Sequence, residues 1–305
     1  MADSTQTNRT RRPILAIVAS VAALSLGDAV VKATSLSLPL WQMYILRSAL
    51  ALPLLWWLAR RQGSVTLHAP LWIVVRSTLL VFMWLSYYAS LPLMPLSLAA
   101  AAYYTGPLFI VALSAAVARR WPTGRALLAI TCGFIGVLMI IRPENSNFEI
   151  ATLLPILAAF LYACAMVLTS AKCSEDSPFV LALALNVAFI VTGVVFGLFS
   201  GREGSLVFGP WQPLDLTLFG TIAVLAVLIL IGSVGAAYAY QKGQPTTVAA
   251  FDYCYLVFSL LWGSLFFNEL PGIIALIGIC VIVGAGILAL PPSRGGTHRK
   301  TADRS

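Results

Sequence analysis

The sequence predicts an all-α membrane protein in which ten helices cross the bilayer. Of its 305 residues, 60% are hydrophobic and only 10% are charged, and the mean hydropathy is +0.91. A soluble domain is about 45–50% apolar and about 25% charged. Apolar runs of about twenty residues, the length needed to cross a hydrocarbon core of about 30 Å, recur along the chain. These features exclude a soluble enzyme, a disordered chain and a coiled coil.

Ten apolar runs are separated by short polar connections rich in turn-forming residues. They are 13–33, 38–59, 70–91, 95–118, 124–141, 151–170, 178–200, 214–240, 245–267 and 271–290. The first run follows Arg11-Arg12 but continues through Asp28 without an A-x-A cleavage site, so we expect a retained helix rather than a signal peptide. In the long eighth run, Gly232 and Gly235 mark the position where an interruption is expected.

Lysine and arginine are distributed unevenly between the two sides of the predicted membrane. If the N-terminus is cytoplasmic, fifteen of the nineteen cations fall at the inner side, and only Arg142 and Arg202 at the outer side. Cytoplasmic loops carry such an excess. The net charge of +8 is therefore explained by membrane topology, and no nucleic-acid partner is expected. We predict a multi-pass membrane protein with both termini in the cytoplasm.

An internal repeat divides the spans into two halves. Shifted by 148 residues, 99–143 aligns without gaps on 247–291 with nine identities in 45 positions, including Gly136 with Gly284. An odd number of spans in each half turns the second half upside down relative to the first. The sequence therefore predicts a cytoplasmic tail at 1–12, two inverted five-helix repeats at 13–143 and 151–291, and a second cytoplasmic tail at 292–305.

Three charged residues lie toward the outer ends of the first two spans. Asp28 and Lys32 are four residues apart and share one face of a helix, and Arg47 lies at a similar depth on the second span. Charges inside a membrane need a partner or a function. We expect Asp28 to pair with Lys32 or Arg47. The pair can be a structural lock between helices or part of a substrate path.

Two further charges lie at matching depth near the inner side. Arg76 is about six residues into the third span, and Asp252 about seven residues into the ninth. We predict that they pair across the two halves as an inner gate. Snorkelling to the headgroups is the alternative for Arg76, but the short side chain of Asp252 should face the interior or water.

Aromatic residues concentrate in the outer half of the first repeat, and those proposed for the substrate path are Trp84, Tyr87, Tyr103 and Tyr104. A membrane-interface belt explains such residues as well as a cavity does. Tyr103 and Tyr104 lie deep enough to line a cavity, where a phenol offers a flat apolar face and a polar tip. Gly106-Pro107 follows at once and should kink the fourth span.

At the level of motifs, the chain resembles the EamA-type transporters of the drug/metabolite transporter superfamily over about residues 13–290. The similar segments are Asp28-Ala29-Val30-Val31-Lys32, Leu46-Arg47, Val75-Arg76-Ser77 and Phe267-Asn268-Glu269. The first three resemble a subset that includes riboflavin and S-adenosylmethionine importers of bacteria. One departure is that Trp121 stands at the repeat position of Glu269, so an acid is present in one half only; we expect Glu269 to cap a helix or turn.

The resemblance implies a secondary transporter that moves a small organic metabolite by alternating access. The aromatic residues and the charges of both signs favour a neutral or zwitterionic planar substrate, with riboflavin uptake as the first candidate. Amino-acid or other metabolite export and S-adenosylmethionine uptake are the alternatives. The sequence leaves open the direction of transport, the coupling ion and the oligomeric state, and it is compatible with a monomer.

An intramembrane enzyme and a channel are the competing classes. Catalysis within a span would need a Ser–His pair, an acid pair or a metal set, and no predicted span contains histidine. The five cysteines have no metal-type spacing, and the charges form no filter ring. No Walker A motif is present. We therefore expect no enzyme activity, no metal and no cofactor.

Overall fold

The computed structural model describes residues 2–33, 38–61, 66–90, 93, 102–141, 153–201, 205, 207–268 and 272–289. Within these ranges the chain is helical with short connections and has no strand. The first half contains α1 (Ala2–Ala33), α2 (Leu40–Arg61), α3 (Pro70–Ser90), α5 (Gly106–Ala118) and α6 (Gly124–Ile141). The second half contains α7 (Leu153–Lys172), α8 (Pro178–Gly197), α9 (Leu216–Lys242), α10 (Pro245–Asp252), α11 (Cys254–Phe267) and α12 (Ile273–Ala289).

Several of these helices have the length and composition of membrane spans. Six stretches of the described chain qualify: Arg11–Val30, Pro70–Ser90, Leu153–Lys172, Pro178–Gly197, Leu216–Lys242 and Pro245–Phe266. Shorter apolar helices occur at Gly106–Ala118, Gly124–Met139 and Leu276–Ala285. Many large apolar side chains on their outer faces are exposed, as Phe82 and Val191 are. Such a surface suits lipid, and the predicted class of all-α membrane protein is confirmed.

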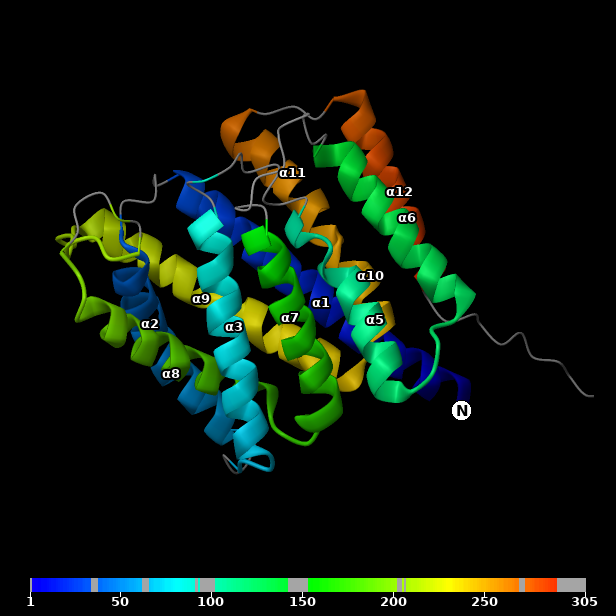
Figure 1. Cartoon of the computed structure of the whole chain (residues 1–305), viewed down its shortest axis with the longest axis horizontal. Coiled ribbons are helices and arrows are strands. Elements are labelled where there is room, and N and C mark those ends of the chain that lie inside the picture. Colours follow the sequence, from blue (N-terminus) through cyan, green and yellow to red (C-terminus); the bar gives the residue numbers. More distant parts are fainter. Residues whose placement is uncertain are drawn as a thin grey trace, which may run out of the picture.

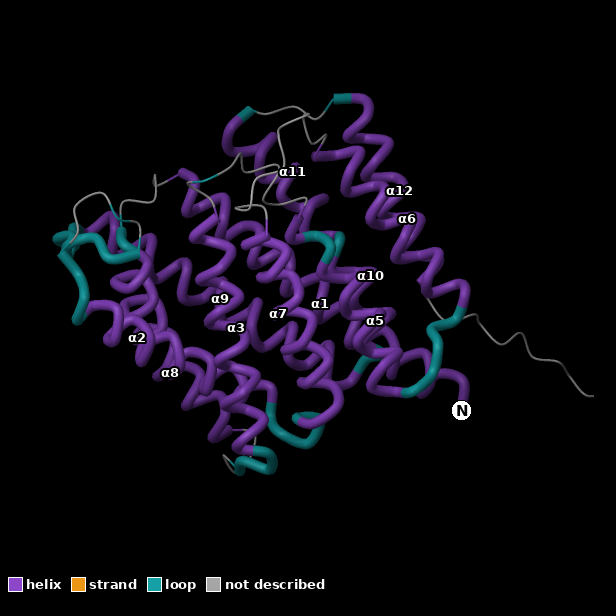
Figure 2. The backbone as a smooth tube through the Cα atoms, in the orientation of Figure 1, coloured by secondary structure: helices purple, strands orange, loops and turns teal. Residues whose placement is uncertain are grey.

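The helices are arranged in pairs that join the first half of the chain to the second. α1 packs on α9, α3 on α7, α2 on α8 and α6 on α12. Figure 1 shows the pair α6–α12 along one edge of the molecule and the pair α2–α8 toward the opposite edge. The remaining helices occupy the space between these two pairs, except that the first part of α9 extends to the edge formed by α2 and α8; the tube in Figure 2 follows the same arrangement. The middle of the molecule is therefore built from both halves.

The predicted interruption of the eighth span at Gly232 and Gly235 is wrong. α9 runs unbroken through both residues. Their lack of a side chain instead lets α1 approach closely: a Cβ on Gly235 would lie 2.9 Å from the carbonyl oxygen of Ala16. The hydroxyl of Ser20 on α1 donates to the carbonyl of Gly232 at 2.6 Å. The glycines serve helix packing, as small residues commonly do in membranes.

The predicted fourth and ninth spans each contain a short turn instead, at which the backbone stays in the right-handed helical region (φ −69° and ψ −12° at Thr105, φ −61° and ψ −19° at Tyr253). α10 ends at Asp252 and α11 begins at Cys254, while a turn at Tyr104 and Thr105 precedes α5, which begins at Gly106. The starts of α5 and α11 are 148 residues apart, the same offset as the sequence repeat. At the first of these turns, Pro107 is the second residue of α5. It has no backbone N–H to donate to a carbonyl of the preceding turn.

The pair α6–α12 provides a matched test of glycine packing. A Cβ on Gly136 of α6 would lie 2.8 Å from the carbonyl oxygen of Gly278, whereas one on Gly284 of α12 would meet no atom within 4 Å. Overpacking costs about 1–3 kcal/mol, and alanine gains up to about 1 kcal/mol over glycine in a helix. We expect Gly136→Ala to lower the melting temperature of the purified protein and Gly284→Ala to leave it unchanged or raise it. Equal effects of the two substitutions would contradict this packing.

Candidate functional site

Tyrosine rings from both halves meet in the middle of the molecule, beside the two helix breaks. We call this set the tyrosine cluster; its members are Tyr87, Tyr88, Tyr103, Tyr104, Tyr162, Tyr240, Tyr253 and Tyr255. Ring centroids lie 5.1 Å apart for Tyr87 and Tyr103, and 5.7 Å apart for Tyr104 and Tyr255. Further ring contacts at 5.9–6.4 Å connect the remaining members, including Tyr162 with Tyr240. Eight of the ten tyrosines of the chain thus form one continuous group.

The four aromatic residues proposed from the sequence lie in or against this cluster. Tyr87, Tyr103 and Tyr104 are members, and the ring of Trp84 stacks on Tyr88 with centroids 5.2 Å apart. The sequence reasoning missed the four tyrosines that α7, α9, α11 and the α10–α11 turn contribute. The 148-residue offset of the internal repeat was the available signal, because it aligns the region around Tyr253 with the turn at Tyr104 and Thr105.

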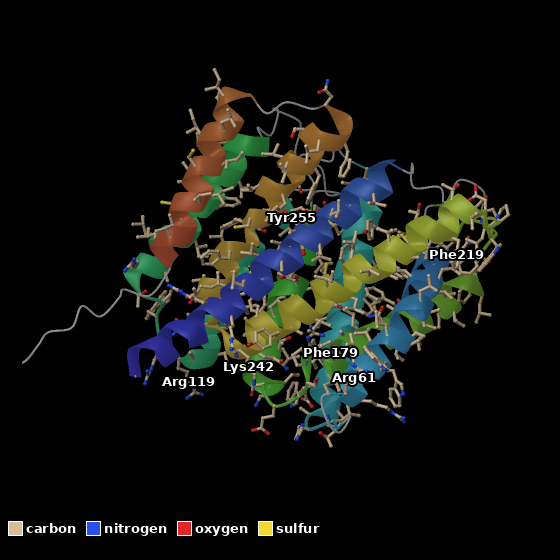
Figure 3. All side chains as sticks on the ribbon, turned by 180° about the vertical axis from the view of Figure 1, so that it is seen from behind. Arg61, Arg119, Phe179, Phe219, Lys242 and Tyr255 are labelled. Atoms are coloured by element: carbon tan, nitrogen blue, oxygen red, sulfur yellow. The ribbon has the colours of Figure 1, made fainter. Side chains whose placement is uncertain are left out.

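Asp28 links α1 to the second half of the chain. Its carboxylate oxygen Oδ2 accepts a hydrogen bond from the hydroxyl of Tyr255 on α11. Figure 3 shows Tyr255 beside α1. Asp28 also lines a small cavity of about 20 Å³ together with Arg47, Trp84 and Tyr88. This is room for about one water molecule at this position.

Arg47 is buried without a full set of hydrogen-bond partners. The side chain is 5% exposed, and its Nε and Nη2 atoms have no partner. The guanidinium carbon lies 5.1 Å from the ring centre of Phe189 and 5.8 Å from that of Tyr44. Such cation–π contacts offset only part of the cost of burying the charge. The guanidinium therefore keeps two buried nitrogen donors without a hydrogen-bond partner.

Two alternative ion-pair partners, Arg47 and Lys32, were predicted for Asp28, and the outcome differs between them. Asp28 and Arg47 line the same cavity but form no ion pair within 4 Å. The pair with Lys32 concerns a side chain that lies outside the described residues. The two charges of opposite sign are therefore neighbours that leave polar atoms unpaired.

Arg76 points into the protein rather than toward the headgroups. It is 1% exposed, and its Nε donates to the hydroxyl oxygen of Thr169 on α7 at 2.6 Å. Its Nη1 lies 3.5 Å from the carbonyl oxygen of Leu181 on α8. The side chain thus joins α3 to two helices of the second half.

Asp252 has phenols as partners. Its Oδ2 accepts hydrogen bonds from the hydroxyls of Tyr162, at 3.3 Å, and Tyr240. No direct Arg76–Asp252 pair is present in this structure, because each side chain is held by other partners. The inner gate predicted from these two residues stays a prediction, now without a direct ion pair.

With this geometry in hand, the chain can be compared with known proteins. It matches the EamA-like transporter family twice, over residues 11–142 and 149–290. The chain belongs to this family. The family is one of transporters and not of enzymes, so this EamA-like transporter carries a small molecule across a lipid bilayer.

Relatives of this EamA-like transporter have several substrates. A riboflavin transporter of Brucella anthropi is 26% identical over 63% of this chain and 66% of its own length, just under two thirds. A pseudopaline exporter of Pseudomonas aeruginosa is 26% identical over 92% of this chain and 96% of its own length. An S-adenosylmethionine uptake transporter of Rickettsia bellii is 24% identical over 74% of this chain and 75% of its own length.

A solved crystal structure has the same fold. It superposes with a TM-score of 0.77 and covers 93% of this chain and 96% of its own, at 15% sequence identity. At that identity the likeness concerns the fold alone. Within the described part of this EamA-like transporter, no group of three or more His, Cys, Asp or Glu residues is placed to hold a metal ion.

Basic side chains of the EamA-like transporter gather at one end of the bundle. Figure 3 shows Arg61, Arg119 and Lys242 along the same edge, with Phe219 at the opposite end of α9. The guanidinium carbon of Arg61 lies 4.0 Å from the ring centre of Trp57, which is 47% exposed. Exposed tryptophans beside cations are typical of a membrane–water interface.

Proposed function

We propose that this EamA-like transporter is a secondary transporter of the bacterial inner membrane that moves a small organic metabolite by alternating access. In this proposal ten spans form two inverted five-helix repeats, with the substrate path between them. The observation that carries the proposal is the position of the two helix breaks. They are 148 residues apart and both lie at the tyrosine cluster, and transporters commonly bind substrate at interrupted helices between repeats.

The pattern of helix contacts supports the inverted repeat. If α1 corresponds to α7 and α3 to α9, the contact of α1 with α9 is equivalent to that of α7 with α3, and both are extensive. The contact of α1 with α11 is likewise equivalent to that of α7 with α5. The two family matches, 11–142 and 149–290, agree with repeats at 13–143 and 151–291 flanked by tails at 1–12 and 292–305.

The proposed substrate path combines flat rings with charges of both signs. Its residues are Asp28, Lys32, Arg47, Trp84, Tyr87, Tyr103 and Tyr104. Aromatic rings stack on planar solutes. A negative charge and a positive charge that line one cavity fit a neutral or zwitterionic molecule better than a strongly charged one. Rocking of one repeat against the other would open this path alternately to the two sides.

Riboflavin uptake is the first candidate activity, because a planar flavin suits the tyrosine cluster and several relatives are named riboflavin transporters. The second candidate is a metabolite with an amino-acid head group, such as S-adenosylmethionine or an exported amino acid. The observation that favours it is the buried guanidinium of Arg47, whose free donors would suit a carboxylate.

Uptake of labelled riboflavin by a flavin-auxotrophic host that expresses the chain tests the first candidate. We expect uptake by the intact protein, and a weaker apparent affinity for Tyr103→Ala and Tyr104→Ala. Loss of one stacking ring costs about 1–3 kcal/mol, a factor of roughly 5 to 150. Tyr238→Ala, on α9 outside the tyrosine cluster, is the matched control. Absence of riboflavin uptake together with export of an amino acid would refute riboflavin and leave the transporter proposal standing.

The orientation of the chain is a separate expectation. We place the basic end of the bundle in the cytoplasm, and with it both termini, because inner loops carry the excess of lysine and arginine. Alkaline-phosphatase fusions, which are active only outside the cytoplasm, should be inactive at the C-terminus and active in the connection near Arg202. An active C-terminal fusion would reverse the orientation.

A further inference from the structure

Asp252 is a buried carboxylate at an interrupted helix. It is the last residue of α10, directly before the turn at Tyr253, and it is 7% exposed. Its Oδ2 accepts hydrogen bonds from Tyr240 on α9 and Tyr162 on α7. Its Oδ1 is buried and has no hydrogen-bond partner. One oxygen of the carboxylate is thus held in place and the other is free.

The described surroundings of Asp252 contain phenols and a thiol. The titratable groups near it are Tyr103, Tyr104, Tyr162, Tyr240, Tyr253 and Cys254. α10 also packs against α1, α5, α6 and α12. No lysine or arginine whose side chain is described lies within ion-pair distance of it from any element. Asp28 differs, because it lines one cavity with Arg47.

An ionised carboxylate in this position has no compensating positive charge among the described side chains. Removing an unpaired charge from water costs free energy, and in membranes such residues commonly mark ion pathways. A divalent metal would need several oxygen ligands, and no cluster of acids surrounds Asp252 within the described chain. The two phenols also direct their hydroxyl protons toward Oδ2, which disfavours a metal there. A proton needs one free oxygen only, and Oδ1 supplies it.

We infer that Asp252 is the proton-binding site that couples transport to a proton gradient. Oδ1 takes one proton from the water on one side of the membrane, which converts the carboxylate into a neutral carboxylic acid. After the change of access it releases that proton to the other side, so that one proton crosses in each cycle. Tyr162 and Tyr240 are positioning residues that orient the carboxylate. The inference rests on the proposed transport function but not on the identity of the substrate.

The turn between α10 and α11 relates Asp252 to the proposed change of access. Asp252 is joined to α7 and α9 by its hydrogen bonds, while α11 is joined to α1 through Tyr255 and Asp28. These side-chain hydrogen bonds of the two parts of the ninth span thus go to different helices, although both parts pack against α1 and α12. In alternating access one repeat largely rocks as a rigid body against the other, around the binding site between them. A change of charge on Asp252 would alter its hydrogen bonds to Tyr162 and Tyr240. It would thereby favour one relative orientation of the two repeats over the other.

Infrared difference spectroscopy tests the proton site without any substrate. The full chain is reconstituted in lipid vesicles, and spectra in acidic and alkaline buffer are subtracted. All eleven Asp and Glu residues contribute to the carbonyl band of protonated carboxylic acids, so the signal of Asp252 is the difference between the spectra of the intact protein and of Asp252→Asn. We expect Asp252→Asn to lose one component of this band, and Asp215→Asn, which removes the exposed cap of α9, to keep that component. A folded Asp252→Asn protein with the same carbonyl band as the intact protein would overturn the inference.

Proton movement coupled to transport is the second measurement. Riboflavin is added to vesicles that contain the protein and a trapped pH-sensitive dye. We expect the internal pH to change together with riboflavin uptake, and this change to fall to the protein-free level in Asp252→Asn but not in Asp215→Asn. An unchanged response in Asp252→Asn, or a requirement for sodium, would overturn the proton site. If riboflavin is not transported at all, the substrate proposal fails and the infrared measurement still decides the inference.

Discussion

Replacing Arg47 by methionine is expected to weaken the apparent affinity of transport by a factor of roughly 10 to 150, while leaving the stability of the protein unchanged or raising it. The guanidinium is 5% exposed, and its Nε and Nη2 atoms are unpaired. An unpaired buried polar group costs about 1–3 kcal/mol. Replacement of buried charges by apolar side chains of similar volume is often neutral or stabilising by about 1–4 kcal/mol. Arg47 therefore holds a charge that the fold itself does not require.

The expected loss of affinity has a separate cause. Without Arg47, the cavity that it shares with Asp28 keeps a single negative charge and loses its donors to the substrate. A hydrogen bond from a charged group to the substrate is worth about 1.5–3 kcal/mol, or a factor of roughly 10 to 150 in affinity. Melting temperature and uptake should be measured on the same preparations, with Arg47→Lys beside Arg47→Met. A methionine variant that transports normally, or one that melts well below the intact protein, would show that Arg47 is a structural residue.

Arg76 should give the opposite result. Its side chain is 1% exposed and links α3 to Thr169 on α7 and to Leu181 on α8. Arg76→Ala removes these bonds and leaves a cavity in the interior of the bundle. Truncation of a large buried side chain typically costs about 2–5 kcal/mol. We expect a large fall in the melting temperature, measured on purified protein.

A matched control for Arg76 exists on the neighbouring helix. Arg61 is exposed at the basic end of α2, so Arg61→Ala should change the free energy of unfolding by no more than about 0.5 kcal/mol. Thr169→Val, which removes only the acceptor of Arg76, should lie between the two, at about 1 kcal/mol. An Arg76→Ala protein as stable as Arg61→Ala would mean that the buried bonds contribute nothing to the fold.

The sequence by itself determined where the chain is helical and apolar. The third span was expected at 70–91 and is observed as Pro70–Ser90; the eighth was expected at 214–240 and is observed as Leu216–Lys242. These agreements have one physical cause. Lipid cannot satisfy backbone hydrogen bonds, so each apolar run of sufficient length forms a helix within itself. The depth of a residue along a span is therefore readable from its sequence position.

The neighbours of each residue were decided by tertiary structure. Arg76 and Asp252 were predicted to pair from their matching depth, yet one binds Thr169 and the other binds two tyrosines. The position of a residue along a span gives only its depth in the membrane. The direction in which its side chain points depends on how the helices rotate and cross. Gly232 looked like a break in isolation and is a contact surface for α1. The tyrosine cluster likewise draws its members from both halves of the chain, because packing between helices, and not any local pattern, brings those rings together.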